Sequence, residues 1–266
     1  MGILNVSPDS FAEASPVRDA ATAVDAALRM EADGADLIDV GAESTRPGAE
    51  PVAAAEELAR VIPVITALAG KMRVPISVDT YKSEVARAAL AAGASIVNDI
   101  SGLRRDPALG REAAAIGAAL VLMHTRGSSA TMYEEAVYGD VVADVVAELR
   151  ESMRLAAAAG VPIDHLIVDP GVGFAKRAGH SYGLLARLSE FGDALDRPVL
   201  VGPSRKSFMR EALGGRAATE RDWGTAAAVT AAVLGGAHIV RVHAVAEMAQ
   251  VVHVAEEIRR AGPQPL

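Results

Sequence analysis

The chain has 266 residues, of which 51% are hydrophobic and only 3% aromatic, and it contains no cysteine. The absence of cysteine excludes disulfides, thiolate metal sites and a cysteine nucleophile. A net charge of −8, with no run rich in lysine and arginine, argues against a nucleic-acid partner. Few aromatic residues also argue against base stacking. An anionic substrate would therefore have to be held by local cations.

Nothing in the sequence indicates export or insertion into a membrane. Met1 runs straight into the apolar segment at residues 2–6, which is too short for a signal peptide. No apolar stretch reaches the length that spans a bilayer. We therefore expect a cytoplasmic protein with no membrane partner.

Short apolar segments alternate along the chain with amphipathic helical patterns. Strands are expected at residues 2–6, 37–40, 76–79, 96–99, 119–123, 166–169, 199–202 and 239–242. Helices are expected at residues 17–32, 53–68, 82–91, 107–116, 140–159, 181–191, 221–234 and 246–260. This alternation predicts parallel strands joined by crossover helices.

Eight such units predict an α/β fold, a closed (β/α)8 TIM barrel, as one domain over residues 1–266. The active site is then expected at the C-terminal ends of the strands. An open, doubly wound sheet is the alternative. Its dinucleotide-binding form has little support, because no Gly-x-Gly-x-x-Gly motif follows the first strand.

Three connections, at residues 7–16, 41–51 and 125–139, are longer than a barrel requires. Barrels build their active sites from the loops that follow the strands. In the second of these loops Ser44 and Thr45 offer hydroxyl groups, and Arg46 offers a forked cation. Because arginine meets phosphate oxygens in pairs, this loop is expected to bind a phosphate or a diphosphate.

Polar residues stand at or near the end of every predicted strand. They are Asn5, Asp39, Asp79, Asn98, His124, Asp169, Arg205 with Lys206, and Arg241 with His243. In a barrel these ends meet at one mouth, so the set predicts a binding site. Lys206 and Arg205 suit a carbonyl or carboxylate oxygen of a substrate.

Two groups of different chemistry can be distinguished within this set. Asp79, Asn98 and Asp169 suit a flat heterocycle rich in N–H donors, because carboxylates accept paired hydrogen bonds. The second group suits a diphosphate and its metal ion, and consists of Asn5, Arg46, Arg241 and His243. The expected ligand is thus a nitrogen heterocycle with an anionic leaving group.

The motifs that carry these residues resemble those of the dihydropteroate synthases, pterin-binding barrel enzymes of folate biosynthesis that sulfonamides target. The matching segments are residues 2–11 (GILNVSPDSF), 41–48 (GAESTRPG), 77–80 (SVDT), 98–102 (NDISG), 122–124 (LMH), 169–174 (DPGVGF), 204–208 (SRKSF) and 241–243 (RVH). The resemblance covers essentially the whole chain.

This resemblance implies a transferase that joins 6-hydroxymethyl-7,8-dihydropterin diphosphate to p-aminobenzoate. The products would be 7,8-dihydropteroate and diphosphate. In similar enzymes the C–O bond to the diphosphate breaks first, and the arylamine then adds to the resulting cation. The resemblance also implies a Mg²⁺ cofactor and a homodimer.

The same resemblance assigns roles to residues. Pterin binding is assigned to Asp79, Asn98, Met123, Asp169 and Lys206. Diphosphate binding is assigned to Asn5, Thr45, Arg46, Arg241 and His243, with the metal at Asn5. Binding of p-aminobenzoate is assigned to Thr45, Arg46, Pro47, Phe174, Lys206 and Ser207. The catalytic residues are expected to be Asp169, Lys206 and Arg241. In the family, two mobile loops assemble the p-aminobenzoate site, and here these are residues 7–16 and 42–51.

The chain departs from the family pattern at several places. Ser7 replaces the usual threonine, and residues 12–15 replace a Ser-Asp-Gly-Gly run. Pro203 replaces a small residue, and Ala244 replaces an acidic one. The chain also begins at the first strand, without the segment that usually precedes it. The changed run at residues 12–15 and Ala244 support one alternative, a pterin-binding paralogue with weak or no synthase activity.

A second alternative is a methyltetrahydrofolate:corrinoid methyltransferase, which shares the pterin pocket of aspartate and asparagine. It needs no diphosphate site, so Arg46, Arg241 and residues 204–206 argue against it.

Overall fold

The computed structural model of the chain describes residues 1–6, 20–44, 49–128 and 131–262. Six strands form one parallel sheet in chain order, and two more form a parallel pair. The first six are β1 (Gly2–Asn5), β2 (Ile38–Gly41), β3 (Ile76–Asp79), β4 (Ile96–Asp99), β5 (Ala119–Met123) and β6 (Leu166–Asp169). The pair consists of β7 (Leu200–Val201) and β8 (Ile239–Val240).

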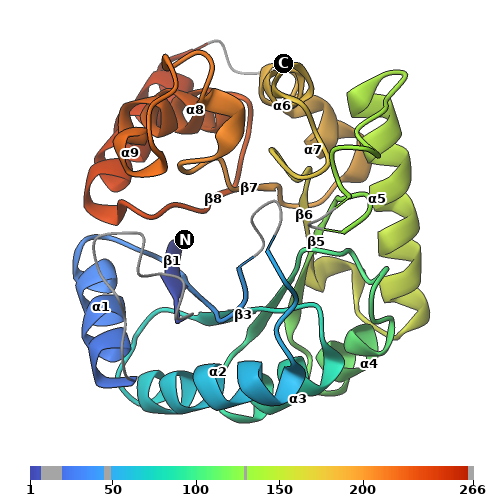
Figure 1. The fold of residues 1–266 in the computed structure, drawn as a ribbon, viewed down its shortest axis with the longest axis vertical. Helices are drawn as coiled ribbons and strands as arrows, with labels where there is room; N and C mark the ends of the chain where they lie inside the picture. The colour runs from blue at the N-terminus through green and yellow to red at the C-terminus, as the bar shows by residue number, and fades with distance from the viewer. Residues whose placement is uncertain (7–19, 45–48, 129–130, 263–266) are drawn as a thin grey trace.

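Single parallel bridges join these two sheets at both edges. Val168 of β6 pairs with Val199, and Gly2 of β1 pairs with Val242. The amide of Ile3 donates a hydrogen bond to the carbonyl of Val242 at 3.0 Å. The strands therefore close into the (β/α)8 barrel that the sequence predicts (Figure 1).

Helices surround this barrel on its outside (Figure 1). They are α1 (Ala20–Ala32), α2 (Ala54–Ala69), α3 (Ser83–Ala91), α4 (Ala108–Ala115), α5 (Val141–Ala158), α6 (Ala178–Ala186), α7 (Ser189–Leu195), α8 (Asp222–Leu234) and α9 (Val245–Ala261). Short 3-10 turns are η2 (Ile163–His165), η3 (Ser207–Met209) and η4 (Ala218–Glu220). In the described part of the chain, no helix is long and apolar enough to cross a membrane.

One predicted helix has the wrong bounds. The pattern at residues 181–191 predicted a single helix, but α6 and α7 occupy this region as two. Arg187 leaves helical geometry, with φ −119° and ψ 29°, so the first helix ends there. Leu184, Leu188 and Phe191 still face the same core, which is why the apolar spacing continued across the break.

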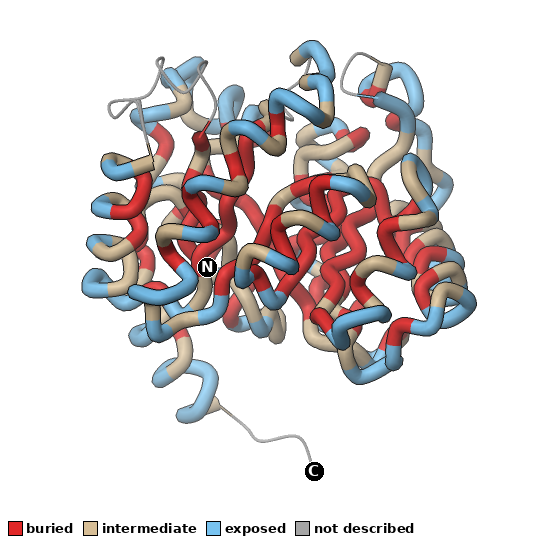
Figure 2. The backbone as a smooth tube through the Cα atoms, turned by 90° about the horizontal axis from the view of Figure 1, so that it is seen from below, coloured by how far each residue is buried: buried red, intermediate tan, exposed pale blue. Residues whose placement is uncertain are grey.

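Burial follows the strands and the inner sides of the helices (Figure 2). All four residues of β2 are buried, as expected for a strand covered on both sides. On α2, the side chains of Val61, Ile65 and Leu68 are buried at the spacing that places them on one helix face. This packing holds the strands rigidly and so fixes the positions of the polar residues at their ends.

Candidate active site

The register of the strands places the predicted pterin residues side by side. Asp79 is the Cα partner of Asn98, and Met123 is the Cα partner of Asp169. Paired residues on neighbouring strands project to the same side of a sheet. Asn98, Met123 and Asp169 are buried. The strand ends therefore bring these four residues to one mouth of the barrel, as predicted.

Arg241, which follows β8, lies between two aspartates. Its Nε donates to Oδ2 of Asp39 at 2.6 Å, and its Nη2 donates to Oδ2 of Asp79 at 2.7 Å. Asp39 Oδ2 also accepts a hydrogen bond from Nδ2 of Asn98 at 3.0 Å. We call Arg241, Asp39, Asp79 and Asn98 the Arg241 cluster. The sequence grouped Arg241 with the diphosphate residues, whereas the structure joins it to the acidic group.

The charges of this cluster do not balance. Burial raises the pKa of Asp79 to about 7; Arg241 opposes this shift, and Asp39 adds to it. Burial would lower the pKa of Arg241, but Asp39 and Asp79 outweigh it, and the pKa is raised. Arg241 thus stays a cation, while Asp79 can change its protonation near neutral pH. A carboxyl group of this kind is typical of functional sites.

Lys206 and Asp169 form a second charged group in the mouth. Lys206 Nζ donates to the carbonyl of Val172 at 2.6 Å and lies 4.3 Å from the ring centroid of Phe174. Burial lowers the pKa of Lys206 to about 8, against the opposing effect of Asp169. Burial also raises the pKa of Asp169, which Lys206 opposes. The structure therefore brings together three residues that the sequence assigned to substrate binding.

The remaining predicted residues lie around the rim. Ser204 Oγ lies 2.9 Å from Nδ1 of His243 and accepts a hydrogen bond from the backbone amide of His243 at 3.2 Å. Ser207 begins η3, and Asn5 ends β1. Three predicted residues, Thr45, Arg46 and Pro47, lie outside the described residues, as does the loop at residues 7–16.

Arg205 does not take the place that the sequence suggested for it. Its Nε and Nη2 donate to the two carboxylate oxygens of Asp222, each at 2.8 Å. Its backbone adopts a φ of 58°, and its amide donates to Oγ1 of Thr225. The side chain therefore ties the loop after β7 to α8, which corrects the expectation of a contact with a substrate oxygen.

A second buried cluster was not foreseen. Lys176 is only 1% exposed; its Nζ donates to the carbonyl of Phe174 at 2.9 Å and lies 2.8 Å from Nδ1 of His124. Nε2 of His124 lies 3.2 Å from Oε2 of Glu148 on α5, and Oε1 of Glu148 accepts a hydrogen bond from Nε of Arg126 at 2.9 Å. We call these residues, without Phe174, the His124 cluster. Burial lowers the pKa of His124 to about 3.

The position of His124 follows from the alternation of side chains along a strand. The sequence placed His124 in the mouth because it follows Met123 at the end of β5. Met123 takes the inward position, so the next side chain turns outward to α5. Asp39, in contrast, was identified from the sequence at a strand end but was assigned no role. Asp39 lies two residues before Gly41, which pairs with the inward-facing Asp79, so alternation along β2 places Asp39 on the inward side as well.

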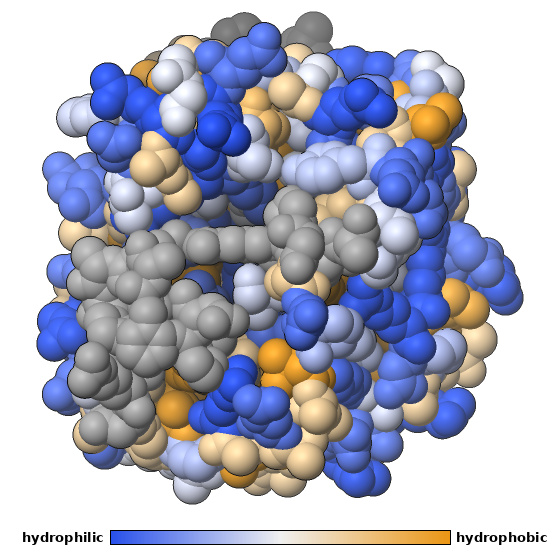
Figure 3. All heavy atoms as spheres, in the orientation of Figure 1, coloured by the Kyte–Doolittle hydropathy of each residue, from blue (hydrophilic) through white to orange (hydrophobic). Residues whose placement is uncertain are grey.

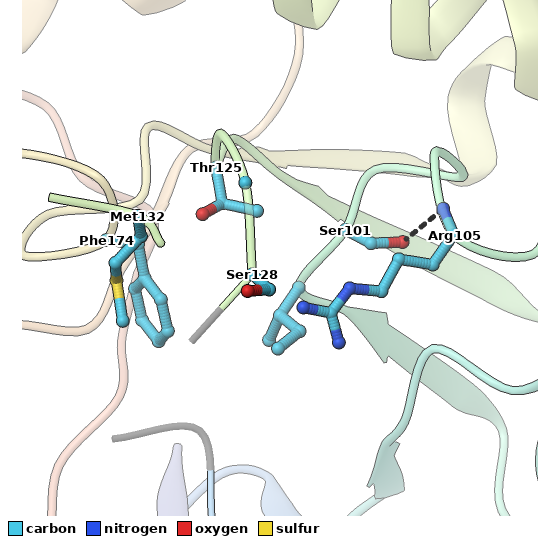
Figure 4. A pocket seen from close by; sticks show the side chains of 8 residues that line it. Ser101, Arg105, Thr125, Ser128, Met132 and Phe174 are labelled. Carbon is cyan, nitrogen blue, oxygen red and sulfur yellow. Dashed lines mark hydrogen bonds between the residues drawn. The ribbon is translucent and has the colours of Figure 1, made fainter. Parts of the chain in front are cut away.

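A hollow opens beside Phe174 at the mouth. It is lined by Ile100, Ser101, Arg105, Thr125, Gly127, Ser128, Met132 and Phe174. Figure 4 shows Phe174 and Met132 on one side and Arg105 on the other. The guanidinium of Arg105 lies 4.5 Å from the ring centroid of Tyr81. Hydrophilic side chains are prominent on this face of the molecule (Figure 3).

The fold and the mouth together define a class: a (β/α)8 barrel whose strand ends bring aspartate, asparagine, lysine and arginine to one mouth. The profile of the family described as pterin binding enzyme matches residues 1–243. The chain belongs to this family.

Individual relatives are similar over nearly the whole chain. The dihydropteroate synthase of Synechocystis sp. is 46% identical over 260 residues, which are 98% of this chain and 90% of that protein. The Yersinia pestis dihydropteroate synthase, solved with a sulfonamide drug, superposes with a TM-score of 0.93 at 41% identity, covering 98% of this chain and 94% of the other. The Xanthomonas albilineans dihydropteroate synthase, solved with 4-aminobenzoic acid, superposes with a TM-score of 0.89 at 42% identity. The match covers 99% of this chain and 93% of the other.

Proposed function

We propose that this protein is a dihydropteroate synthase, a transferase of folate biosynthesis. It joins 6-hydroxymethyl-7,8-dihydropterin diphosphate to p-aminobenzoate, and it releases diphosphate and 7,8-dihydropteroate. The observation that carries the proposal is the convergence of Asp79, Asn98, Asp169 and Lys206 on one mouth beside Arg241. The 46% identity to the Synechocystis enzyme supports it.

The pterin is proposed to bind against the ends of β3 to β6. Its ring edge presents N–H donors and a carbonyl oxygen, which suit the carboxylates of Asp79 and Asp169 and the amide of Asn98. Lys206 supplies a donor for the carbonyl. As the C–O bond to the diphosphate breaks, positive charge develops on the pterin, and the buried carboxylate of Asp169 stabilises it.

The diphosphate is proposed to bind Asn5, Thr45, Arg46, Arg241 and His243. The described residues include no group of three or more acidic or histidine side chains that could hold a metal by themselves. Mg²⁺ commonly takes one or two protein ligands and completes its shell with substrate phosphates and water. The amide oxygen of Asn5 at the end of β1 fits this donor chemistry. The ion would offset negative charge on the leaving group.

The p-aminobenzoate is proposed to lie beside Phe174, with Lys206 and Ser207, and to be completed by Thr45, Arg46 and Pro47. The hollow at Phe174 borders this position. Lys206 contacts the ring of Phe174, and the negative charge of Asp169 in the proposed pterin site stabilises its ammonium group. We therefore place Lys206 between the two substrates. The catalytic residues are then Asp169, Lys206 and Arg241.

A homodimer is also proposed from the resemblance, and a cytoplasmic location from the sequence. Exposed apolar side chains on α8 and α9 suit a contact between two copies: Trp223 is 90% exposed, Val254 62% and Ile258 54%. Light scattering on the purified protein tests the dimer. A monomer at micromolar concentration would contradict it.

A coupled assay of diphosphate release tests the proposed activity. Purified protein is incubated with the dihydropterin diphosphate and Mg²⁺, with and without p-aminobenzoate, and the pteroate product is quantified. Release that depends on both p-aminobenzoate and Mg²⁺ is the expected result. Full activity after exhaustive chelation would contradict the role of the metal. Pterin binding without turnover would favour the paralogue instead.

A further inference from the structure

We propose that Asp39 is a positioning residue that fixes Asn98 and Arg241 in their working geometry and so links the pterin subsite to the diphosphate subsite. The inference rests on the proposed function. Asp39 lies on β2, is fully buried, and uses one oxygen, Oδ2, to accept from Nδ2 of Asn98 at 3.0 Å and from Nε of Arg241 at 2.6 Å.

Both hydrogen bonds restrict side chains that would otherwise rotate. The Asn98 amide can present either its oxygen or its nitrogen to a ligand, and the bond to Asp39 assigns the nitrogen inward and leaves the oxygen for the pterin. The Arg241 guanidinium is held by Asp39 at Nε and by Asp79 at Nη2. These two bonds fix the plane of the guanidinium, and so they fix the directions of its remaining N–H donors. One carboxylate thus sets the orientation of a group in each subsite.

The arrangement around Asp39 is less favourable for the free energy of folding than a purely structural ion pair would be. Oδ1 of Asp39 is buried and has no hydrogen-bond partner among the described residues, and the same holds for Oγ of Ser77, its Cα partner on β3. Buried acceptors without partners destabilise a fold, so natural structures keep few of them. One cation shared by two carboxylates is likewise poor compensation. Such local conflict is typical of functional sites, where stability is given up for function.

Two variants of Asp39 separate its hydrogen bonds from its charge. In Asp39→Asn, the amide oxygen can still accept from Asn98 and Arg241, but the negative charge is lost. In Asp39→Ala, both are lost. The matched control is Asp99→Asn on β4. Asp99 is also fully buried, but its hydrogen bonds go to the backbone amides of Ser101 and Leu103 and to the side chain of Ser101.

The first experiment measures kcat and KM for both substrates, corrected for the folded fraction by circular dichroism. We expect kcat to fall roughly tenfold in Asp39→Asn and on the order of a hundredfold or more in Asp39→Ala. The KM for p-aminobenzoate at saturating pterin diphosphate should change less than about twofold, because neither partner of Asp39 belongs to that subsite. Asp99→Asn should lower stability but leave kcat per folded molecule unchanged.

The pH profile of kcat/KM for the pterin diphosphate gives a readout that a structural role would not move. Asp79 is faced by Arg241, by Asp39 on β2, by Glu57 on α2 and by Glu43 after β2. Removing the charge of Asp39 removes one cause of the raised pKa of Asp79. The acid limb should therefore shift to lower pH in Asp39→Asn, by on the order of 0.5 unit. Asp99→Asn should show no shift.

Calorimetry with two separate probes distinguishes failure of this inference from failure of the proposed function. Inorganic diphosphate probes Arg241, and 6-hydroxymethylpterin probes Asn98. If the wild type binds both and Asp39→Ala weakens both by tenfold or more, the positioning role stands even without turnover. The inference would be overturned if Asp39→Ala bound both probes with wild-type affinity. It would also be overturned if Asp39→Ala kept the wild-type kcat per folded molecule and the wild-type pH profile.

Discussion

The Arg241 cluster and the His124 cluster are both largely buried, and both combine cations with carboxylates near the same end of the barrel. Their charges are nevertheless balanced in opposite ways. In the first, one cation serves two carboxylates, and the pKa of Asp79 is raised to about 7. In the second, burial would raise the pKa of Glu148, but hydrogen bonds from His124, Arg126 and Arg104 hold it well below its usual value.

This difference indicates what each cluster does. In the His124 cluster the carboxylate of Glu148 has donors from the cluster and from Arg104. Lys176 of this cluster donates to the carbonyl of Phe174 and so holds the loop after β6. The Arg241 cluster is left short of positive charge, which the cation developing on a bound pterin would supply. We therefore expect changes in the Arg241 cluster to affect mainly activity and changes in the His124 cluster to affect mainly stability.

The largest effect is expected for Arg241→Ala. The variant removes the one cation of the Arg241 cluster and leaves Asp39 and Asp79 facing each other. Loss of a charged donor in a transition state costs up to about 4 kcal/mol, or about a thousandfold in rate. Diphosphate release measures it, with Arg241→Lys as a control that keeps the charge but not the paired geometry. Turnover within threefold of wild type would show that Arg241 serves only the fold.

Asp169→Asn is expected to lower the rate with little effect on folding. The substitution keeps size and removes the negative charge that we propose stabilises the pterin cation, at a cost of ~2–4 kcal/mol, or about two to three decades in rate. Single-turnover kinetics and thermal unfolding measure the two effects separately. If the variant lost stability but kept its turnover, Asp169 would be a cap for Gly171, whose amide donates to it at 2.7 Å.

Lys176→Met tests the opposite expectation in the His124 cluster. Methionine keeps the length of the buried side chain but leaves the carbonyl of Phe174 and a ring nitrogen of His124 without their donor. Unsatisfied buried groups cost about 1–3 kcal/mol each, so urea unfolding should show a loss of about 2–3 kcal/mol. The kcat should change less than in Asp169→Asn. An unchanged free energy of unfolding would mean that the cluster contributes nothing to the fold.

Asp79→Asn should stabilise the protein while it lowers activity. A carboxyl whose folded pKa is raised to about 7 contributes stability that is fully present below its unfolded pKa and is lost as pH rises through 7. Asparagine has no charge to bury, so above pH 7 the variant should gain about 1–2 kcal/mol over wild type. Unfolding free energies at pH 5 and pH 8 give the comparison. A gain that is equal at both values would exclude titration of Asp79 as its cause.

The smallest effect is expected for His124→Gln, in the way its free energy of unfolding changes at acid pH. His124 is held neutral with a folded pKa of about 3, so its contribution is complete above the unfolded pKa near 6.5 and is lost as pH falls toward 3. Wild type should lose about 1 kcal/mol from this group between pH 6.5 and 5.5. The glutamine variant should lack that part of the slope. Parallel slopes in the two proteins would contradict the burial of a neutral His124.

The sequence by itself determined the barrel and most of its strands. The bounds expected for residues 76–79, 96–99, 119–123 and 166–169 are those of β3, β4, β5 and β6. This was possible because a buried parallel strand needs a short apolar run, and a crossover needs an amphipathic helix, and both are local patterns. The same locality identified the polar strand ends, since all parallel strands end at one face.

Only the tertiary structure decided which of these polar groups meet. Asp39 and Arg241 are 202 positions apart, and their contact depends on closure of the barrel between β8 and β1. The outward turn of His124 and the pairing of Arg205 with Asp222 depend likewise on which helix packs behind each strand. Local patterns carry no information on such partners, because hydrogen bonds and ion pairs act over a few ångströms in space, whatever the distance along the chain.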